Sequence, residues 1–151
     1  MRTSTILLML VAAALCAAPF TAAQAQPAAT SAATPAFDVA GTDAAKVQAF
    51  LKCLQTSLTI DNRMKVASLF SYPVEVSVGG QVITLRNASD LQANYSRVFD
   101  AALRQAIASA KVDTLFANAK GVMFDNGRVW FAPVGNNAAL KITRINEPVT
   151  Q

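Results

Sequence analysis

Residues 120–133 read Lys-Gly-Val-Met-Phe-Asp-Asn-Gly-Arg-Val-Trp-Phe-Ala-Pro, with an apolar run on each side of Asn126-Gly127. Asn-Gly favours the centre of a type I′ turn, because both central residues need a positive φ, which these two tolerate. The stretch therefore predicts a β-hairpin. In that hairpin four pairs would lie opposite each other: Asp125 and Arg128, Phe124 and Val129, Met123 and Trp130, and Val122 and Phe131.

This hairpin would have two distinct faces, because side chains alternate along a strand. One face is entirely apolar and is assigned to the core: Val122, Phe124, Val129 and Phe131. The other carries Met123 and Trp130 at its middle and the Asp125–Arg128 pair at its tip. Such a face is typical of a pocket wall or of a second packing surface, and we expect Trp130 to be largely buried.

Residues 1–25 have the pattern of a secretory signal peptide. Arg2 supplies a positive charge, residues 6–15 form a short apolar run, and residues 23–25 (Ala-Gln-Ala) fit the small-x-small cleavage rule. The pattern predicts a mature start at Gln26 and a periplasmic or secreted protein without membrane association after cleavage. An uncleaved membrane anchor is the alternative, but the apolar run is short for a membrane span.

The remaining chain is long enough for one domain with a real core. Removal of Arg2 leaves 12 Lys and Arg against 9 Asp and Glu, a net charge of +3. The basic residues are scattered from Lys46 to Arg144, whereas nucleic-acid binding needs a concentrated basic patch. We therefore expect no nucleic acid among the partners.

The two cysteines argue against a disulfide framework. Cys16 lies in the signal peptide, and Leu15 precedes it where a lipidation site needs a small residue, so we reject lipidation. Cys53 would be either a buried apolar group or one half of a bond between two chains of a homodimer. Its amphipathic surroundings, with Phe50 and Leu54 nearby, favour burial.

Residues 26–36, composed largely of Ala, Thr, Ser and Pro, are expected to form a disordered leader. A helix is predicted to begin at Thr42-Asp43, because apolar residues then recur at helical spacing: Val47, Phe50, Leu51, Leu54 and Leu58. Asp61 is expected to cap a second, shorter helix, with a catalytic acid as its alternative role. The apolar side of this second helix would be Val66, Leu69 and Phe70, and Tyr72-Pro73 would end it.

Two further strand patterns accompany the main hairpin. Residues 74–78 and 81–85 alternate apolar and polar positions around Gly79-Gly80, which suits a hairpin turn. Residues 140–145 predict a last strand. Its two faces would be Leu140 with Ile142, and Lys141 with Thr143 and Ile145.

Residues 87–107 predict one long helix. Asn87 would cap it, with Asp90 three residues later near the positive end of the helix dipole. Its apolar residues form one wide stripe, and Asp100 and Arg104 have the spacing of a surface ion pair. Helices followed mostly by strands predict an α+β domain over residues 37–148, with the helices on one face of a curved antiparallel sheet.

Several segments carry a family resemblance: residues 69–73 (Leu-Phe-Ser-Tyr-Pro), Gly79-Gly80, residues 95–99, residues 121–123 with Asn126-Gly127, and Trp130-Phe131. In order and pattern they resemble small exported proteins of the nuclear-transport-factor-2-like superfamily, which includes SnoaL-like and ketosteroid-isomerase-like proteins. The resemblance implies a cone: a strongly bent antiparallel sheet around one long central helix, with a cavity at its open end. It makes five residues candidates to line that cavity, with plain core packing as the alternative for each: Phe50, Tyr72, Tyr95, Met123 and Trp130.

The composition leaves few catalytic chemistries. The chain has no histidine, and a single mature cysteine cannot build a thiolate metal site, so we expect no metal and no cofactor. Carboxylate and phenol chemistry remains. Glu75 is the only acid inside a strand pattern and is a weak candidate for a catalytic base, with a pair to Arg86 as the alternative. Ketosteroid isomerases use an Asp base with a Tyr and a protonated Asp, but no position here matches that motif.

Two functions therefore stay open. The favoured one is a non-catalytic exported module that binds a small apolar molecule or a protein partner. The other is a lyase or isomerase of the ketosteroid-isomerase or SnoaL type, working through Glu75 and a tyrosine. A purely structural homodimer would require a large apolar outer face on the sheet.

Overall fold

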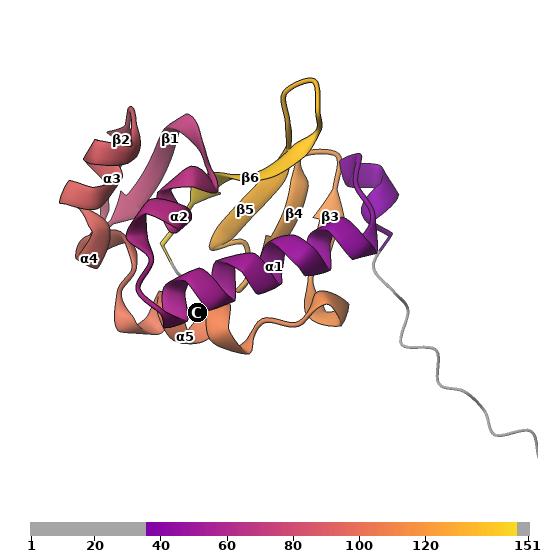
Figure 1. Ribbon diagram of the computed structural model, residues 1–151, viewed down its shortest axis with the longest axis horizontal. Coiled ribbons are helices and arrows are strands. Elements are labelled where there is room, and N and C mark those ends of the chain that lie inside the picture. The colour runs from indigo at the N-terminus through magenta and orange to yellow at the C-terminus, as the bar shows by residue number, and fades with distance from the viewer. Residues whose placement is uncertain (1–35, 148–151) are drawn as a thin grey trace, which may run out of the picture. The chain divides into compact units, whose positions relative to one another are not determined.

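A six-stranded sheet with helices packed on it makes up residues 36–147, the part of the chain that the computed structural model describes (Figure 1). The α+β class predicted from the sequence is confirmed. The predicted signal peptide, Cys16 and leader residues 26–35 lie outside the described residues. In chain order the elements are η1 (Phe37–Ala40), α1 (Ala44–Thr59), α2 (Arg63–Ser68), β1 (Phe70–Val78), β2 (Gln81–Leu85), α3 (Ala88–Ala93), α4 (Tyr95–Val98), α5 (Ala101–Ser109), η2 (Val112–Thr114), β3 (Phe116–Asn118), β4 (Gly121–Phe124), β5 (Val129–Val134) and β6 (Ala139–Ile145).

The sheet is mixed rather than purely antiparallel. Its strand order is β2-β1-β6-β5-β4-β3, and β1 pairs with β6 in parallel while the other neighbours are antiparallel. The expected antiparallel sheet was thus wrong at one pair, which joins residues as far apart in sequence as Glu75 and Arg144 and is invisible to local patterns. Strand β3 was also not predicted, because three residues are too few for an alternation signal.

The hairpin of β4 and β5 has the predicted register. Its opposed pairs are Val122 and Phe131, Met123 and Trp130, and Phe124 and Val129. Asn126 and Gly127 have φ values of 53° and 82°, the positive values that a type I′ turn needs. The N–H of Arg128 donates to the carbonyl of Asp125 at 3.0 Å and closes the turn. All four side chains assigned to the core face are buried.

The substitution Gly127→Val is expected to lower the free energy of unfolding by more than about 1 kcal/mol, because a β-branched residue is strained at positive φ. A Cβ at this position would also lie 3.3 Å from the sulfur of Met123, so the neighbour would have to move. Urea unfolding followed by circular dichroism measures the change. A melting temperature equal to that of the parent protein would contradict the turn.

Helix α1 lies across one face of the sheet (Figure 1), which we call the inner face. The carboxylate of Asp43 caps the helix by accepting from the backbone N–H of Lys46 at 2.8 Å, close to the predicted start at Thr42-Asp43. Its apolar side packs on the strands, and the ring of Phe50 stacks on Phe131 with centroids 4.7 Å apart. The inner face is therefore the core.

The single long helix expected over residues 87–107 is instead three helices, α3, α4 and α5. Asp100 has an extended backbone, with φ −63° and ψ 170°, and its carboxylate accepts from the N–H of Leu103 at 2.6 Å. A residue that caps a new helix cannot continue the preceding one. The predicted Asp100–Arg104 pair is also wrong, because the second carboxylate oxygen of Asp100 binds Arg128 at 2.9 Å.

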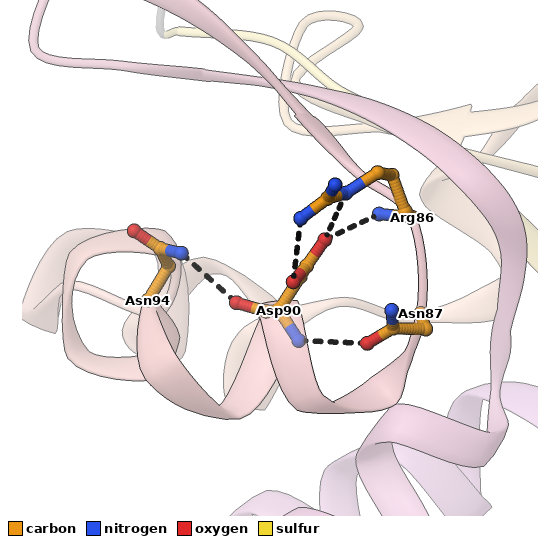
Figure 2. Close-up of polar contacts among 4 residues, drawn as sticks. All are labelled: Arg86, Asn87, Asp90 and Asn94. Atoms are coloured by element: carbon orange, nitrogen blue, oxygen red, sulfur yellow. Dashed lines mark hydrogen bonds and ion pairs between the residues drawn. The ribbon is translucent and has the colours of Figure 1, made fainter.

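The start of α3 confirms the predicted Asn87 cap (Figure 2). The side-chain oxygen of Asn87 accepts from the N–H of Asp90 at 3.0 Å. The Asp90 carboxylate in turn accepts from the backbone N–H of Arg86 at 3.0 Å and from its Nε at 2.9 Å. The side-chain hydrogen bond from Arg86 is the main reason that the pKa of Asp90 is below its ordinary value. At the other end of α3, the Asn94 amide donates to the carbonyl of Asp90 at 2.9 Å.

The second helix differs from its prediction at both ends. Asn62 rather than Asp61 caps α2, by accepting from the N–H of Lys65 at 3.0 Å, while Asp61 occupies the preceding turn with a φ of 48°. The helix ends at Ser68, and Tyr72-Pro73 lies within β1 instead of ending the helix. Pairing of β1 with β6 decides this boundary, and it outweighs the helical spacing of the local sequence.

A β-bulge in β6 moves Ile145 to the core face. The pairing with β5 shifts between Ile142 and Arg144, which leaves Thr143 as an extra residue. One added residue reverses the alternation, so Ile145 shares the buried face with Ile142. The sequence had predicted opposite faces for these two isoleucines.

Candidate functional site

One row of directly opposed residues crosses all six strands on the face of the sheet opposite the core. From β3 to β2 it comprises Phe116, Met123, Trp130, Arg144, Glu75 and Thr84. We call these six residues the outer row. All of them are exposed or half-buried, whereas Val122, Phe131 and Ile142 on the inner face are fully buried. The outer row is apolar over β3, β4 and β5 and charged over β6 and β1.

Trp130 lies at the centre of the outer row. Most of its side chain is buried, in agreement with the prediction, and the remainder is exposed. Its indole Nε1 donates to the carbonyl of Gly127 at 2.9 Å. The one polar group of this side chain is therefore satisfied within the protein. What the side chain can still offer a ligand is the apolar face of its ring.

A hollow of about 430 Å³ borders Trp130. It is lined by Lys120, Trp130, Thr143, Arg144 and Asn146. The amide of Asn146 donates to the Gly127 carbonyl at 2.8 Å, which is the carbonyl that also binds the indole, and so ties the two side chains to one turn. Polar and basic groups thus surround an aromatic surface, an arrangement suited to a ligand with an apolar body and a polar edge.

Glu75 lies on the charged half of the outer row and pairs with Arg144, not with Arg86 as the sequence suggested. The oxygen–nitrogen distance is 2.5 Å, and each side chain is about half exposed, at 53% and 54%. Arg86 is occupied by Asp90. Glu75 is thus engaged by a cation at the exposed surface and does not face an enclosed cavity, where a general base would act on a substrate.

The five residues proposed to line one cavity do not meet. Phe50 and Tyr95 are buried in the core. Only Met123 and Trp130 are neighbours, and they lie on the outer face. Tyr72 packs at the border of the core through its ring, 6.1 Å from that of Phe70. For Phe50 and Tyr95, the alternative of plain core packing describes their environment.

Neither tyrosine is placed as a base. The Tyr72 hydroxyl donates to the Ala67 carbonyl at 3.1 Å, and burial raises the pKa of this phenol to about 12. Burial likewise raises the pKa of Tyr95, whose ring lies 4.8 Å from the guanidinium of Arg63 and 5.5 Å from that of Arg104. Both phenols are therefore neutral near pH 7 and can act only as hydrogen-bond donors or acceptors.

The described residues offer no other obvious chemistry. Among residues 36–147, no group of three or more His, Cys, Asp or Glu side chains could hold a metal ion. In the same range, no helix has the length and apolarity needed to cross a membrane. Cys53 is a free thiol, half-buried against the core, which fits the expected burial in part.

Sequence patterns missed two residues of the outer row: Phe116 was assigned to a turn, and Arg144 was not singled out. Of the residues around the hollow, Lys120 and Asn146 were not singled out either. One signal was present at Asn118, whose side chain accepts from the N–H of Lys120 at 2.8 Å, because Asn in a short polar segment is typical of a turn between strands.

No protein-family model, curated protein or solved structure matches the chain.

Proposed function

We propose that this chain is a non-catalytic, exported binding module that holds a small molecule with an apolar face on its outer row. The observation that carries the proposal is the apolar half of that row, where partly exposed Trp130 borders a hollow of about 430 Å³. Phe116, at the end of the apolar half, is 53% exposed. Together with the partly exposed Met123 and Trp130 beside it, Phe116 gives a contiguous apolar surface of the kind that marks interaction sites.

The polar edge of the hollow favours a small molecule over an extended protein surface. Lys120 and Thr143 line the hollow together with Trp130, so an apolar body on the indole could direct a polar substituent toward them. A protein partner, or a second copy of the chain, is the competing occupant and becomes an outcome of the experiment below.

The alternative function, a lyase or isomerase that uses Glu75 and a tyrosine, has less support. Glu75 is exposed and paired with Arg144, and burial raises the pKa of Tyr72 to about 12. The three groups considered for catalysis also lie in separate places: Glu75 on the outer face, Tyr72 at the border of the core and Tyr95 within the core. Glu75, the one carboxylate proposed as a base, lacks the enclosed apolar environment that a raised carboxyl pKa would require.

We also propose that the domain belongs to the nuclear-transport-factor-2-like superfamily and that its sheet has the cone shape of that fold. The order of helices and hairpins, and the packing of helices on one face of the sheet, support this assignment. The three short helices in place of one long helix, and the parallel β1–β6 pair, are departures from the expected pattern. Export rests on the signal-peptide pattern of residues 1–25.

The substitution Trp130→Ala tests the binding proposal. We expect it to weaken binding of 2-naphthol, an uncharged apolar probe, at least tenfold. The free energy of unfolding should fall by about 2–3 kcal/mol, less than for a fully buried tryptophan, because part of the side chain is exposed. Binding is measured by ¹H–¹⁵N NMR titration, in which shifts should concentrate at Met123, Trp130 and Asn146.

Val82→Ala is the matched control, since Val82 is 67% exposed at the other end of the sheet. It should leave probe binding unchanged. Unchanged binding in Trp130→Ala would contradict the proposed site. Native mass spectrometry of the exported protein tests the competing occupants. If the protein retains a second protein or a second copy of itself, and Trp130→Ala loses it, a protein partner or a homodimer replaces the small-molecule proposal.

A further inference from the structure

We propose that a cleft at Arg128 is a second ligand site, which takes a small organic monocarboxylate with a short apolar body. The cleft lies away from the hollow at Trp130 and shares none of its lining residues. It forms where the C-terminal ends of the parallel strands β1 and β6 meet the junction of α4 and α5. The proposal is independent of the function proposed above.

Arg128 is a buried cation with few hydrogen bonds. Its side chain is only 7% exposed. A guanidinium carries five N–H donors, yet the described residues supply a single hydrogen bond, from Nη2 to the Asp100 carboxylate at 2.9 Å. Nε is buried without a partner, and Nη1 approaches the Asp125 carboxylate only to 3.9 Å, which is beyond hydrogen-bond distance.

Burial of the Arg128 guanidinium to this degree costs free energy, because most of its N–H donors have lost water without gaining a hydrogen-bond acceptor in the protein. A buried cation is stabilised only when its partners replace the water it has lost. Asp100 supplies part of that compensation, but its other oxygen is engaged by the N–H of Leu103 at 2.6 Å. The guanidinium therefore retains capacity for a further anionic acceptor.

The cleft beside Arg128 combines this guanidinium with an apolar wall. Its volume is about 280 Å³, and Val78, Val98 and Ile145 contribute apolar surface. Arg97 provides a second guanidinium at the rim, held by the side-chain oxygen of Asn94 at 3.1 Å. A carboxylate accepts parallel hydrogen bonds from a guanidinium fork, and its alkyl chain would replace water along the valines.

The charges of the lining decide between a monoanion and a dianion. Within the lining, Arg97 and Arg128 face Asp100 and Glu147, and the Glu147 carboxylate also accepts from the N–H of Gly80 at 2.9 Å. Asp125, outside the lining, adds a third carboxylate 3.9 Å from Arg128. A phosphate dianion would therefore face two carboxylates at close range. A monocarboxylate adds only one negative charge, and its alkyl chain can lie against the apolar part of the lining.

An NMR titration with acetate, butanoate and hexanoate tests the proposal. Shifts are expected at Ser77, Gly79, Val98 and the Nε–H of Arg128. Affinity should rise about fourfold for each added methylene, the value that corresponds to burial of one CH₂ group. Inorganic phosphate should bind more weakly than butanoate, and tighter phosphate binding would overturn the assignment to monocarboxylates.

Charge variants at the rim localise the site without removing Arg128. Ser77→Asp should weaken hexanoate binding at least tenfold, whereas Thr84→Asp, which adds the same charge at an exposed position on β2, should not. Arg97→Gln, at an exposed residue, should weaken binding several-fold and serves if Ser77→Asp does not fold. Trp130→Ala should leave hexanoate binding intact. Absence of shifts at the cleft, or equal binding in Ser77→Asp and Thr84→Asp, would overturn the proposal and leave Arg128 with a purely structural role.

Discussion

Phe131→Ala is expected to lower the free energy of unfolding by about 3–5 kcal/mol, a large share of the stability of a small domain. Phe131 is fully buried on β5, at the middle of the inner face. Its ring stacks on Phe50 of α1 and lies 6.4 Å from the ring of Phe124. Removal of this ring would leave a cavity between the helix and the sheet, which the surrounding rings cannot fill without repacking.

Phe116→Ala is the matched control for this experiment. It deletes the same side chain from β3, but Phe116 is 53% exposed on the outer row. The expected loss is below about 1 kcal/mol. Urea unfolding of both variants gives the comparison, and similar losses would contradict the assignment of β5 to the core and of β3 to the outer edge.

Gly121→Ala is expected to cost roughly 2–5 kcal/mol, the sum of backbone strain and overpacking. Gly121 has a φ of 133°, which side-chain-bearing residues rarely adopt. A Cβ there would lie 2.6 Å from the backbone oxygen of Phe131 and 3.0 Å from the Cβ of Ala132. Neither neighbour is the end of a flexible side chain, so β4 and β5 would have to move apart.

Gly80→Ala separates the two causes. Gly80 also has a positive φ, of 76°, but a Cβ there would meet no atom within 4 Å. Only the backbone term should remain, about 1 kcal/mol. Thermal unfolding should rank Gly121→Ala well below Gly80→Ala in stability, and equal melting temperatures would contradict the close approach of β4 to β5.

The candidate site was only partly predictable. Met123 and Trp130 were assigned to the non-core face of the hairpin by alternation alone, and the structure puts them there. Their proposed neighbours Phe50, Tyr72 and Tyr95 came from a family resemblance, and they lie elsewhere. Glu75 was placed correctly on a face but with the wrong partner, because the parallel β1–β6 pair brings Arg144 opposite it.

The amino-acid sequence by itself determined the structures that depend on a few adjacent residues. Asn126-Gly127 set the hairpin register through its tolerance of positive φ. Asn87 started α3 because its side-chain oxygen reaches an N–H three residues later. Alternation of apolar and polar residues in β4 and β5 chose the inner face, since a strand has only two sides.

The tertiary structure alone decided what distant segments do to one another. The buried guanidinium of Arg128 holds Asp100 where a helix restarts, although spacing had favoured a pair with Arg104. The bulge at Thr143 turns Ile145 into the core and sets Arg144 beside Trp130. These outcomes depend on contacts between residues that are far apart in the chain. Such contacts form only once the sheet has brought the residues together, and their free energy then exceeds the preference of each short segment for a helix or a strand.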